Sequence, residues 1–190
     1  MKAAILMFAV LMGSLALGQA QPEPKPAAEV PAANPADVKS IDSIVAALYD
    51  VISGPAGQKR DWNRFRSLFW PGAHLIPLVT PPGKTGYAAR VLSVEDYVTR
   101  TDPFFAKEGF YESALANRVD QWAQIASVFS TYESRHAKGE KPFARGINSI
   151  QVMNDGQRWW VVNILWESES EQNLLPERML RPPGGKQEKQ

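Results

Sequence analysis

The sequence predicts an α+β fold in which a curved antiparallel sheet packs against three N-terminal helices. The first half of the region expected to fold spaces its apolar residues by three and four, as helices do. The second half consists of runs rich in β-branched and aromatic residues, which are typical of strands. The turn Asn154-Asp155-Gly156-Gln157 between the last two runs is a strong hairpin signal. Helices followed by strands, rather than an alternation of the two, favour an α+β arrangement.

The composition excludes several classes of function. The chain has 190 residues, a net charge of +1, two histidines and no cysteine. The balanced charge gives no basis for binding nucleic acid. The lack of cysteine excludes disulfides, thiolate catalysis, Cys-ligated zinc and iron–sulfur clusters. His74 and His136 are too few for a His-rich metal site, and no phosphate-binding or dinucleotide-binding motif occurs, so we expect no metal and no cofactor.

Residues 1–20 have the pattern of a secretory signal peptide. Lys2 precedes an apolar run over residues 3–17 that ends in Gly18-Gln19-Ala20, so cleavage is expected after Ala20. An uncleaved N-terminal anchor is the alternative, because the run is near the lower length limit of a spanning helix. Cleavage predicts an exported protein, periplasmic or secreted, with no membrane segment left.

The two ends of the remaining chain are expected to lie outside the folded domain. Residues 21–36 contain five of the 15 prolines and are expected to form an extended spacer. Residues 182–190 have a similar character and are expected to be a disordered tail. The folded domain is therefore predicted over residues 37–181, which is long enough to enclose a core and a pocket.

The first two expected helices begin at aspartates. Asp37 is predicted to cap a helix that ends at Ser53-Gly54-Pro55. Asp61 is predicted to cap a shorter helix that Pro71-Gly72 ends. Three arginines lie in or beside this second helix and are interpreted as a solvated face rather than an anion site: Arg60, Arg64 and Arg66.

A capping box predicts the third helix. Ser93 with Asp96 three residues later is the sequence pattern of such a box, and Pro103 is expected to end or kink the helix that follows. Five strands are expected, one before this helix over residues 73–79 and four after it over residues 111–122, 125–135, 145–153 and 158–167.

The last of these strands is apolar on both faces, because Trp160, Val162 and Ile164 alternate with Trp159 and Val161. A strand of this kind must be covered on both sides. The helices supply one cover. The other is expected to be a second copy of the chain, which makes the protein a homodimer through the sheet with Trp159 in the interface.

The order of these elements resembles the nuclear transport factor 2-like superfamily, and within it the SnoaL-like polyketide cyclase branch. The resemblance covers about residues 38–170 and rests on three features. They are the first helix with Leu48-Tyr49, the segment DWNRFRSLF that leads through Pro71-Gly72-Ala73 into a strand, and the final four strands. It implies a cone-shaped α+β barrel that is commonly dimeric, with a pocket between sheet and helices.

The resemblance also implies where a catalytic acid or base would lie. Enzymes of the superfamily use a pocket carboxylate or histidine as a base, and isomerase-like members carry the acid on the strand after the second helix. Here no Asp or Glu lies between Asp61 and Glu95, and Pro77 stands near the expected position. His74 is the remaining acid–base candidate on this strand, although a structural histidine is the favoured interpretation.

Other candidates for the pocket come from the later strands and from the aromatic residues. Tyr132 is expected to donate a hydrogen bond, and Arg145 and Asn148 to orient a polar group of a ligand. For Arg145 the favoured interpretation is a structural one, a cross-strand pair with Glu133. Four aromatic residues are expected to line the pocket as well: Trp70, Tyr97, Phe105 and Trp166.

Three functional hypotheses follow. The favoured one is non-catalytic binding of a small hydrophobic or aromatic molecule. The second is a cofactor-independent isomerase, cyclase or dehydratase with His74 as base and Tyr132 as hydrogen-bond donor. The third is a structural dimerisation module whose cavity is filled by Trp70, Tyr97 and Phe105.

Overall fold

The computed structural model describes residues 30–183. The predicted signal peptide (1–20), residues 21–29 of the predicted spacer and residues 184–190 of the predicted tail lie outside the described residues. The helices are α1 (Pro35–Val38), α2 (Ile41–Ile52), α3 (Trp62–Ser67), α4 (Val94–Phe105) and a short C-terminal 3-10 helix, η1 (Glu177–Met179). The strands are β1 (Phe69–Val79), β2 (Ala88–Ala89), β3 (Leu92–Ser93), β4 (Tyr111–Trp122), β5 (Ile125–Arg135), β6 (Ala144–Asn154) and β7 (Trp159–Ser168).

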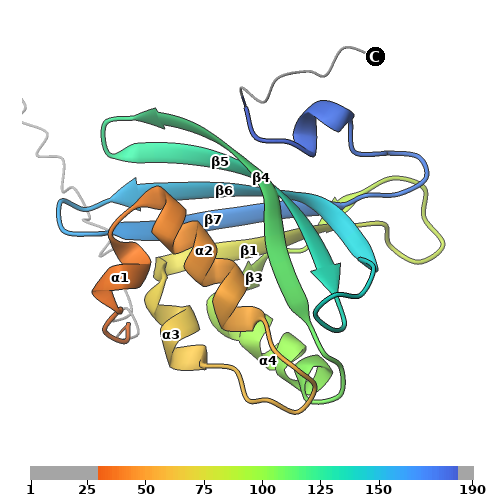
Figure 1. Ribbon diagram of the computed structural model, residues 1–190, viewed down its shortest axis with the longest axis horizontal. Coiled ribbons are helices and arrows are strands. Elements are labelled where there is room, and N and C mark those ends of the chain that lie inside the picture. The colour runs from red at the N-terminus through yellow and green to blue at the C-terminus, as the bar shows by residue number, and fades with distance from the viewer. Residues whose placement is uncertain (1–29, 184–190) are drawn as a thin grey trace, which may run out of the picture.

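These strands form one curved sheet in the order β2-β1-β7-β6-β5-β4, with β3 paired to β1. Helices α2, α3 and α4 lie on its concave side, and the C-terminal segment with η1 lies on the other side (Figure 1). The predicted α+β fold class is therefore confirmed. One pairing differs from the expected antiparallel pattern, since β1 runs parallel to β7. The long stretch of chain between these two strands permits a parallel pairing, which a tight turn does not.

The N-terminal helices follow their capping residues. The expected first helix is broken in two, because Asn34 caps α1 and the Ser40 side chain accepts from the Ser43 amide to cap α2. Asp37 lies inside α1 and is not the cap that the sequence predicted. The cap at Asp61 is confirmed.

The capping box predicted for the third helix is also confirmed, and that helix contains Pro103 and ends at Phe105. The expected end of the second helix is wrong. Helix α3 stops at Ser67, and Pro71-Gly72 lies inside β1 at an irregularity of its pairing with β7.

The three arginines are structural, which corrects their interpretation as a solvated face. Arg60 is buried and donates to the carbonyl oxygens of Ile52 at 2.7 Å, Gln58 at 2.7 Å and Gly54 at 2.8 Å. This guanidinium therefore satisfies the carbonyl groups of the loop that follows α2.

The other two arginines make ion pairs. Arg64 binds Asp37 at 2.7 Å and Asp50 at 2.5 Å, and so ties α3 to α1 and α2. Arg66 binds Glu95 at 2.5 Å, which ties α3 to α4.

A bulge in β7 decides which of its residues face the helices. Val161 pairs with Val152 and Asn163 pairs with Gln151, so Val162 is an extra residue in the ladder. Trp159 and Val161 face the helices before the bulge, and Ile164 and Trp166 face them after it. Trp159 is buried in the core, with 8% of its surface exposed, so its predicted place in a dimer interface is wrong.

The C-terminal segment (residues 169–183) covers part of the outer face of the sheet. The Thr131 hydroxyl donates to the Met179 carbonyl at 2.5 Å, and the Arg118 guanidinium donates to the Arg178 carbonyl. The outer side of β4 and β5 is thus covered partly by the chain itself. No helix within residues 30–183 is both long enough and apolar enough to cross a membrane.

Candidate functional site

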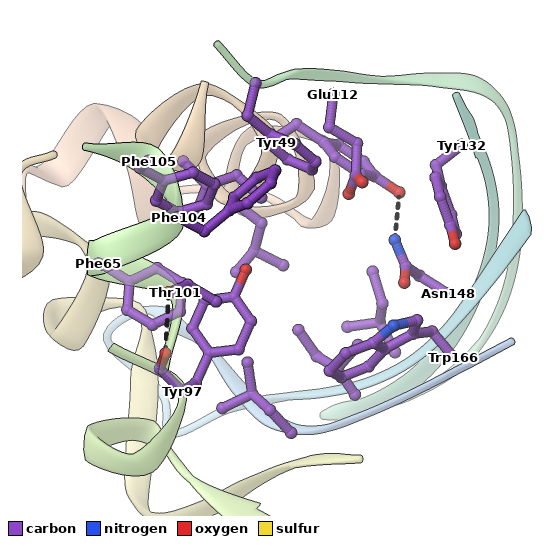
Figure 2. Close-up of a pocket in the computed structure, with 16 residues that line it drawn as sticks. Tyr49, Phe65, Tyr97, Thr101, Phe104, Phe105, Glu112, Tyr132, Asn148 and Trp166 are labelled. Carbon is purple, nitrogen blue, oxygen red and sulfur yellow. Dashed lines mark hydrogen bonds between the residues drawn. The ribbon is translucent and has the colours of Figure 1, made fainter. Parts of the chain in front are cut away.

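A cavity of about 250 Å³ lies between the inner face of the sheet and helices α2 and α4. Four of its polar side chains gather on one wall, where Tyr49, Glu112, Tyr132 and Asn148 face one another (Figure 2). Six aromatic residues line the rest together with aliphatic side chains: Phe65, Tyr97, Phe104, Phe105, Phe110 and Trp166. The Tyr97 hydroxyl points into the cavity from the side opposite the polar wall (Figure 2).

Glu112 is the acid of this cavity, and the start of β4 determines its direction. The Glu112 amide donates to the Ser53 hydroxyl at 3.0 Å, which fixes β4 against the end of α2. Glu112 is in register with Ser134 on β5, whose hydroxyl donates to the Glu112 carboxylate at 2.8 Å. Both side chains therefore point toward the helices, as cross-strand partners on one face do.

Tyr49 reaches from α2 to the middle of the sheet. Its hydroxyl is 2.6 Å from the Ser130 hydroxyl and accepts from the Asn148 amide nitrogen at 3.1 Å. Ser130 and Asn148 are themselves partners in the β5–β6 ladder. The polar ends of all three side chains are therefore satisfied where α2 crosses the sheet.

Tyr132 lies between the two serines on the inner face of β5, and its hydroxyl is 3.0 Å from that of Ser168. Gly146 on β6 makes room for this ring. A Cβ atom at position 146 would lie 2.6 Å from the Tyr132 hydroxyl and 2.3 Å from the Glu167 carbonyl oxygen. The lack of a side chain at Gly146 thus permits the position of Tyr132.

Burial dominates the protonation of these groups. It raises the pKa of Glu112 from 4.5 to about 7, although the hydrogen bonds from Ser134 and Asn148 act in the opposite direction. Burial also raises the pKa of Tyr132 to about 12 and those of Tyr49 and Tyr97 well above their ordinary value. The tyrosines are therefore neutral hydrogen-bonding groups at neutral pH, whereas the Glu112 carboxyl titrates in this pH range.

Glu112 and Tyr49 also line a second hollow, an open groove of about 740 Å³ between α2, β4 and the loop after β5. The groove is polar, with Asp50, Arg135 and Lys138 along it. The wall formed by Glu112 and Tyr49 therefore separates the aromatic cavity from a wide, polar groove.

Five of the predicted ligand-binding residues line the cavity: Tyr97, Phe105, Tyr132, Asn148 and Trp166. The other three lie elsewhere. Trp70 is 39% exposed and packs edge-on against Trp160 with 5.3 Å between ring centroids. Arg145 points outward and binds Glu169 at 2.8 Å, rather than a ligand or its ladder partner Glu133.

The prediction of His74 as a pocket base is wrong. His74 is exposed and pairs in register with Ser93 and Asn163, whereas its neighbour Leu75 is buried and lines the cavity. Successive residues of a strand point to opposite faces, so His74 and Tyr132 lie on opposite sides of the sheet. The enzymatic hypothesis that joined these two residues is excluded by this geometry.

Sequence reasoning missed Glu112, the acid that the cavity does contain. One available signal was the alternation of hydroxyl residues Ser130, Tyr132 and Ser134, which marks a polar stripe on one face of β5. An acid at the start of the preceding strand is the natural partner for such a stripe. The described residues hold no group of three or more His, Cys, Asp or Glu side chains arranged for a metal ion.

Comparison with solved structures identifies the fold. One similar structure is a nuclear transport factor 2-like protein of unknown function from Pseudomonas putida KT2440, with a TM-score of 0.51 and 9% identity over 72% of this chain and 92% of the other. Another is a protein of unknown function with a cystatin-like fold from Nostoc punctiforme PCC 73102, with a TM-score of 0.52 and 11% identity over 69% and 90% of the two chains.

A third similar structure, from Kribbella flavida, has a TM-score of 0.51 and 9% identity over 68% of this chain and 88% of the other. Identities this low show the fold alone, so the domain has the nuclear transport factor 2-like fold, and its place in the SnoaL-like branch stays a prediction. Neither a protein-family model nor a curated protein sequence matches the chain.

The raised pKa of Glu112 predicts a specific dependence of stability on pH. A carboxyl whose pKa is higher in the folded than in the unfolded state stabilises the fold at low pH and loses this contribution as pH rises through the folded value. A rise from 4.5 to about 7 corresponds to roughly 3 kcal/mol. We expect Glu112→Gln to gain about this much free energy of unfolding relative to wild type between pH 4 and pH 8, measured by urea denaturation.

Glu133→Gln is the matched control, because Glu133 lies on the neighbouring strand and binds Arg135 at 2.5 Å outside the cavity. This variant should follow the wild-type pH dependence. Parallel curves for Glu112→Gln and wild type would contradict the burial of the Glu112 carboxyl.

Proposed function

We propose that this protein is an exported binding protein that holds a small, mostly apolar molecule in the cavity between sheet and helices. The observation that carries the proposal is the cavity itself, about 250 Å³ lined by aromatic residues with polar groups on one wall. An apolar cavity of about 150 Å³ holds benzene, so by proportion this one suits a molecule of roughly ten non-hydrogen atoms. Export rests on the sequence of residues 1–20 alone.

The geometry favours binding over a purely structural module. The hypothesis of a structural module required Trp70, Tyr97 and Phe105 to fill the cavity. Tyr97 and Phe105 line it and leave its volume free, and Trp70 lies away from it. Polar groups on one wall also suit recognition, since they fix the orientation of a ligand whose body is apolar.

Proton transfer is a second candidate function, and one observation favours it. Glu112 has a pKa near 7 beside an aromatic cavity, which is the condition under which a carboxyl serves as a general base or acid. Its position between the cavity and the open groove gives it a route for exchanging protons with water. Tyr97 and Tyr132 would donate hydrogen bonds to an oxygen atom that gains charge.

We further propose that the protein is a homodimer through the part of the outer sheet face that the C-terminal segment leaves open. Trp122 and Ile125 are 78% and 60% exposed there, and they adjoin Met153 and Val162 in a shallow groove that runs across the strands. Large exposed apolar patches of this kind mark interaction surfaces. A second copy offers the same patch and satisfies the twofold symmetry of a closed dimer.

Filling the cavity tests the binding function. Ile164→Phe adds bulk inside the cavity, whereas Leu165→Phe adds it on the outer face of the same strand. We expect 2-naphthol to bind wild type and Leu165→Phe alike in isothermal titration calorimetry, and to bind Ile164→Phe at least about tenfold more weakly, which is about 1.4 kcal/mol. An unchanged affinity in a folded Ile164→Phe would refute the site.

A base-promoted elimination tests the second function. Removal of the C–H proton of 5-nitrobenzisoxazole by a carboxylate breaks the N–O bond and releases a coloured cyanophenolate. We expect the rate with wild type to rise with pH around a midpoint near 7 and to fall about 100-fold in Glu112→Gln. Glu133→Gln should retain the wild-type rate. Equal rates for wild type and Glu112→Gln would exclude Glu112 as the base.

A charged substitution tests the dimer. We expect wild type to have the mass of a dimer in light scattering and Ile125→Lys to have that of a monomer, because the substitution buries an unpaired charge in the interface. Leu174→Lys, at an exposed position of the C-terminal segment, should stay dimeric. A monomeric wild type, or a dimeric Ile125→Lys, contradicts the proposed interface.

A further inference from the structure

The charge of the cavity lining has one sign. Glu112 is the acid among the lining residues, and the residues that line the cavity include no Lys, Arg or His. The remaining polar lining groups are hydroxyls and one amide: Tyr49, Tyr97, Thr101, Tyr132 and Asn148. A ligand that carries a negative charge would therefore be desolvated without a cationic partner and would be repelled by Glu112.

Two cations line the groove beside Glu112, and both contact other groups. Arg135 binds Glu133 at 2.5 Å and donates to the Glu140 carbonyl at 2.6 Å. Lys138 lies 5.7 Å from the centroid of the Tyr111 ring, on the side of the open groove. Within the described part of the chain, the carboxylate thus has hydrogen-bonding neighbours but no paired cation.

The aromatic wall is suited to a positive charge as well. Tyr97 stacks on Phe65 with 5.3 Å between centroids and meets Trp166 edge-on at 6.5 Å. The negative faces of such rings attract cations, and the attraction is stronger where water is excluded. Burial is the main cause of the raised pKa of Tyr49, Tyr97 and Tyr132, and the Glu112 charge adds to the rise.

We propose that the ligand is a small organic amine that binds as its cation, with the ammonium group on Glu112 and an apolar or aromatic body among Tyr97, Phe105 and Trp166. The inference rests on the proposed binding function and names the chemical class of its ligand. A neutral alcohol of the same shape fits the same cavity but leaves the carboxylate unpaired, and a carboxylate of the same shape is excluded by charge.

The pH dependence of amine binding is determined by Glu112 and by the charged and titratable groups around it. In the cavity they are Tyr49 on α2, Tyr97 on α4 and Tyr132 on β5, all neutral near pH 7. Six others line the groove: Asp42, Asp50, Tyr111, Arg135, Lys138 and Glu140. Glu112 is thus the cavity group that changes charge near neutral pH, so amine binding should release a proton below pH 7.

Three probes of one shape test the inference: 2-phenylethylamine, 2-phenylethanol and phenylacetate, measured by calorimetry at pH 8. We expect the amine to bind at least about tenfold more tightly than the alcohol, and phenylacetate to bind most weakly. Glu112→Gln should weaken amine binding by about 30-fold more than alcohol binding, which is the lower range for removing one partner of a buried charge pair. Glu171→Gln, at an exposed position of the C-terminal segment, should leave this preference unchanged.

A pH comparison on the wild-type protein serves if Glu112→Gln does not fold. Amine affinity should rise about tenfold from pH 6 to pH 8, since Glu112 ionises between them, whereas alcohol affinity should not rise. If the alcohol binds as tightly as the amine, the amine inference is overturned and cavity binding stands. If neither these probes nor 2-naphthol binds, both proposals fall. An amine preference that persists in Glu112→Gln places the amine elsewhere and overturns the inference.

Discussion

The architecture of the site depends on Tyr49, which works as a spacer between α2 and the sheet. Its ring extends from the helix, and its hydroxyl is held by Ser130 at 2.6 Å and Asn148 at 3.1 Å. Because a phenol is long and rigid, this attachment keeps the helix at a fixed distance from the inner face. The Ser53 hydroxyl anchors the end of the same helix to β4. The cavity beside Tyr49 is the space that remains once both attachments are made.

Hydrogen-bonding neighbours on the same wall help to accommodate an acid there. Ser134 and Asn148 lower the pKa of Glu112, but burial outweighs them and leaves the group near 7 rather than at its ordinary value. Burying such a carboxyl costs little free energy when it is protonated and more when it is charged. Amine binding and proton transfer would each use the charged form of Glu112. Both proposals therefore depend on the unfavourable free energy of burying this charge.

Much of the fold could be predicted because its signals are local. The caps at Asp61 and Ser93 and the turn at Asp155-Gly156 depend on a few adjacent residues. The bulges at Leu115 and Val162 depend on pairing between strands, and each reverses which residues face inward. Unless the positions of these bulges are known, the face of the sheet on which Glu112 or Trp159 lies cannot be predicted.

The site was predicted less well for the same reason. Aromatic residues such as Tyr97 and Trp166 are expected near a cavity in any small domain of this kind, whereas the acid had to be located by register. The resemblance directed attention to the strand after the second helix, which holds no acid. The chain instead carries its acid on β4, where Ser134 of the adjacent strand provides its hydrogen bond.

The bulge at Val162 has a consequence for how the sequence can change over time. An insertion or deletion of one residue near it would shift the second half of β7 by one place. A deletion would place Leu165 and Glu167 where Ile164 and Trp166 line the cavity wall, and an insertion would place Asn163 and Leu165 there. Such a change alters the shape and charge of the cavity together without any substitution inside it. A change in chain length at this point is therefore equivalent to several point mutations, and alignments of related sequences should be gapped here with care.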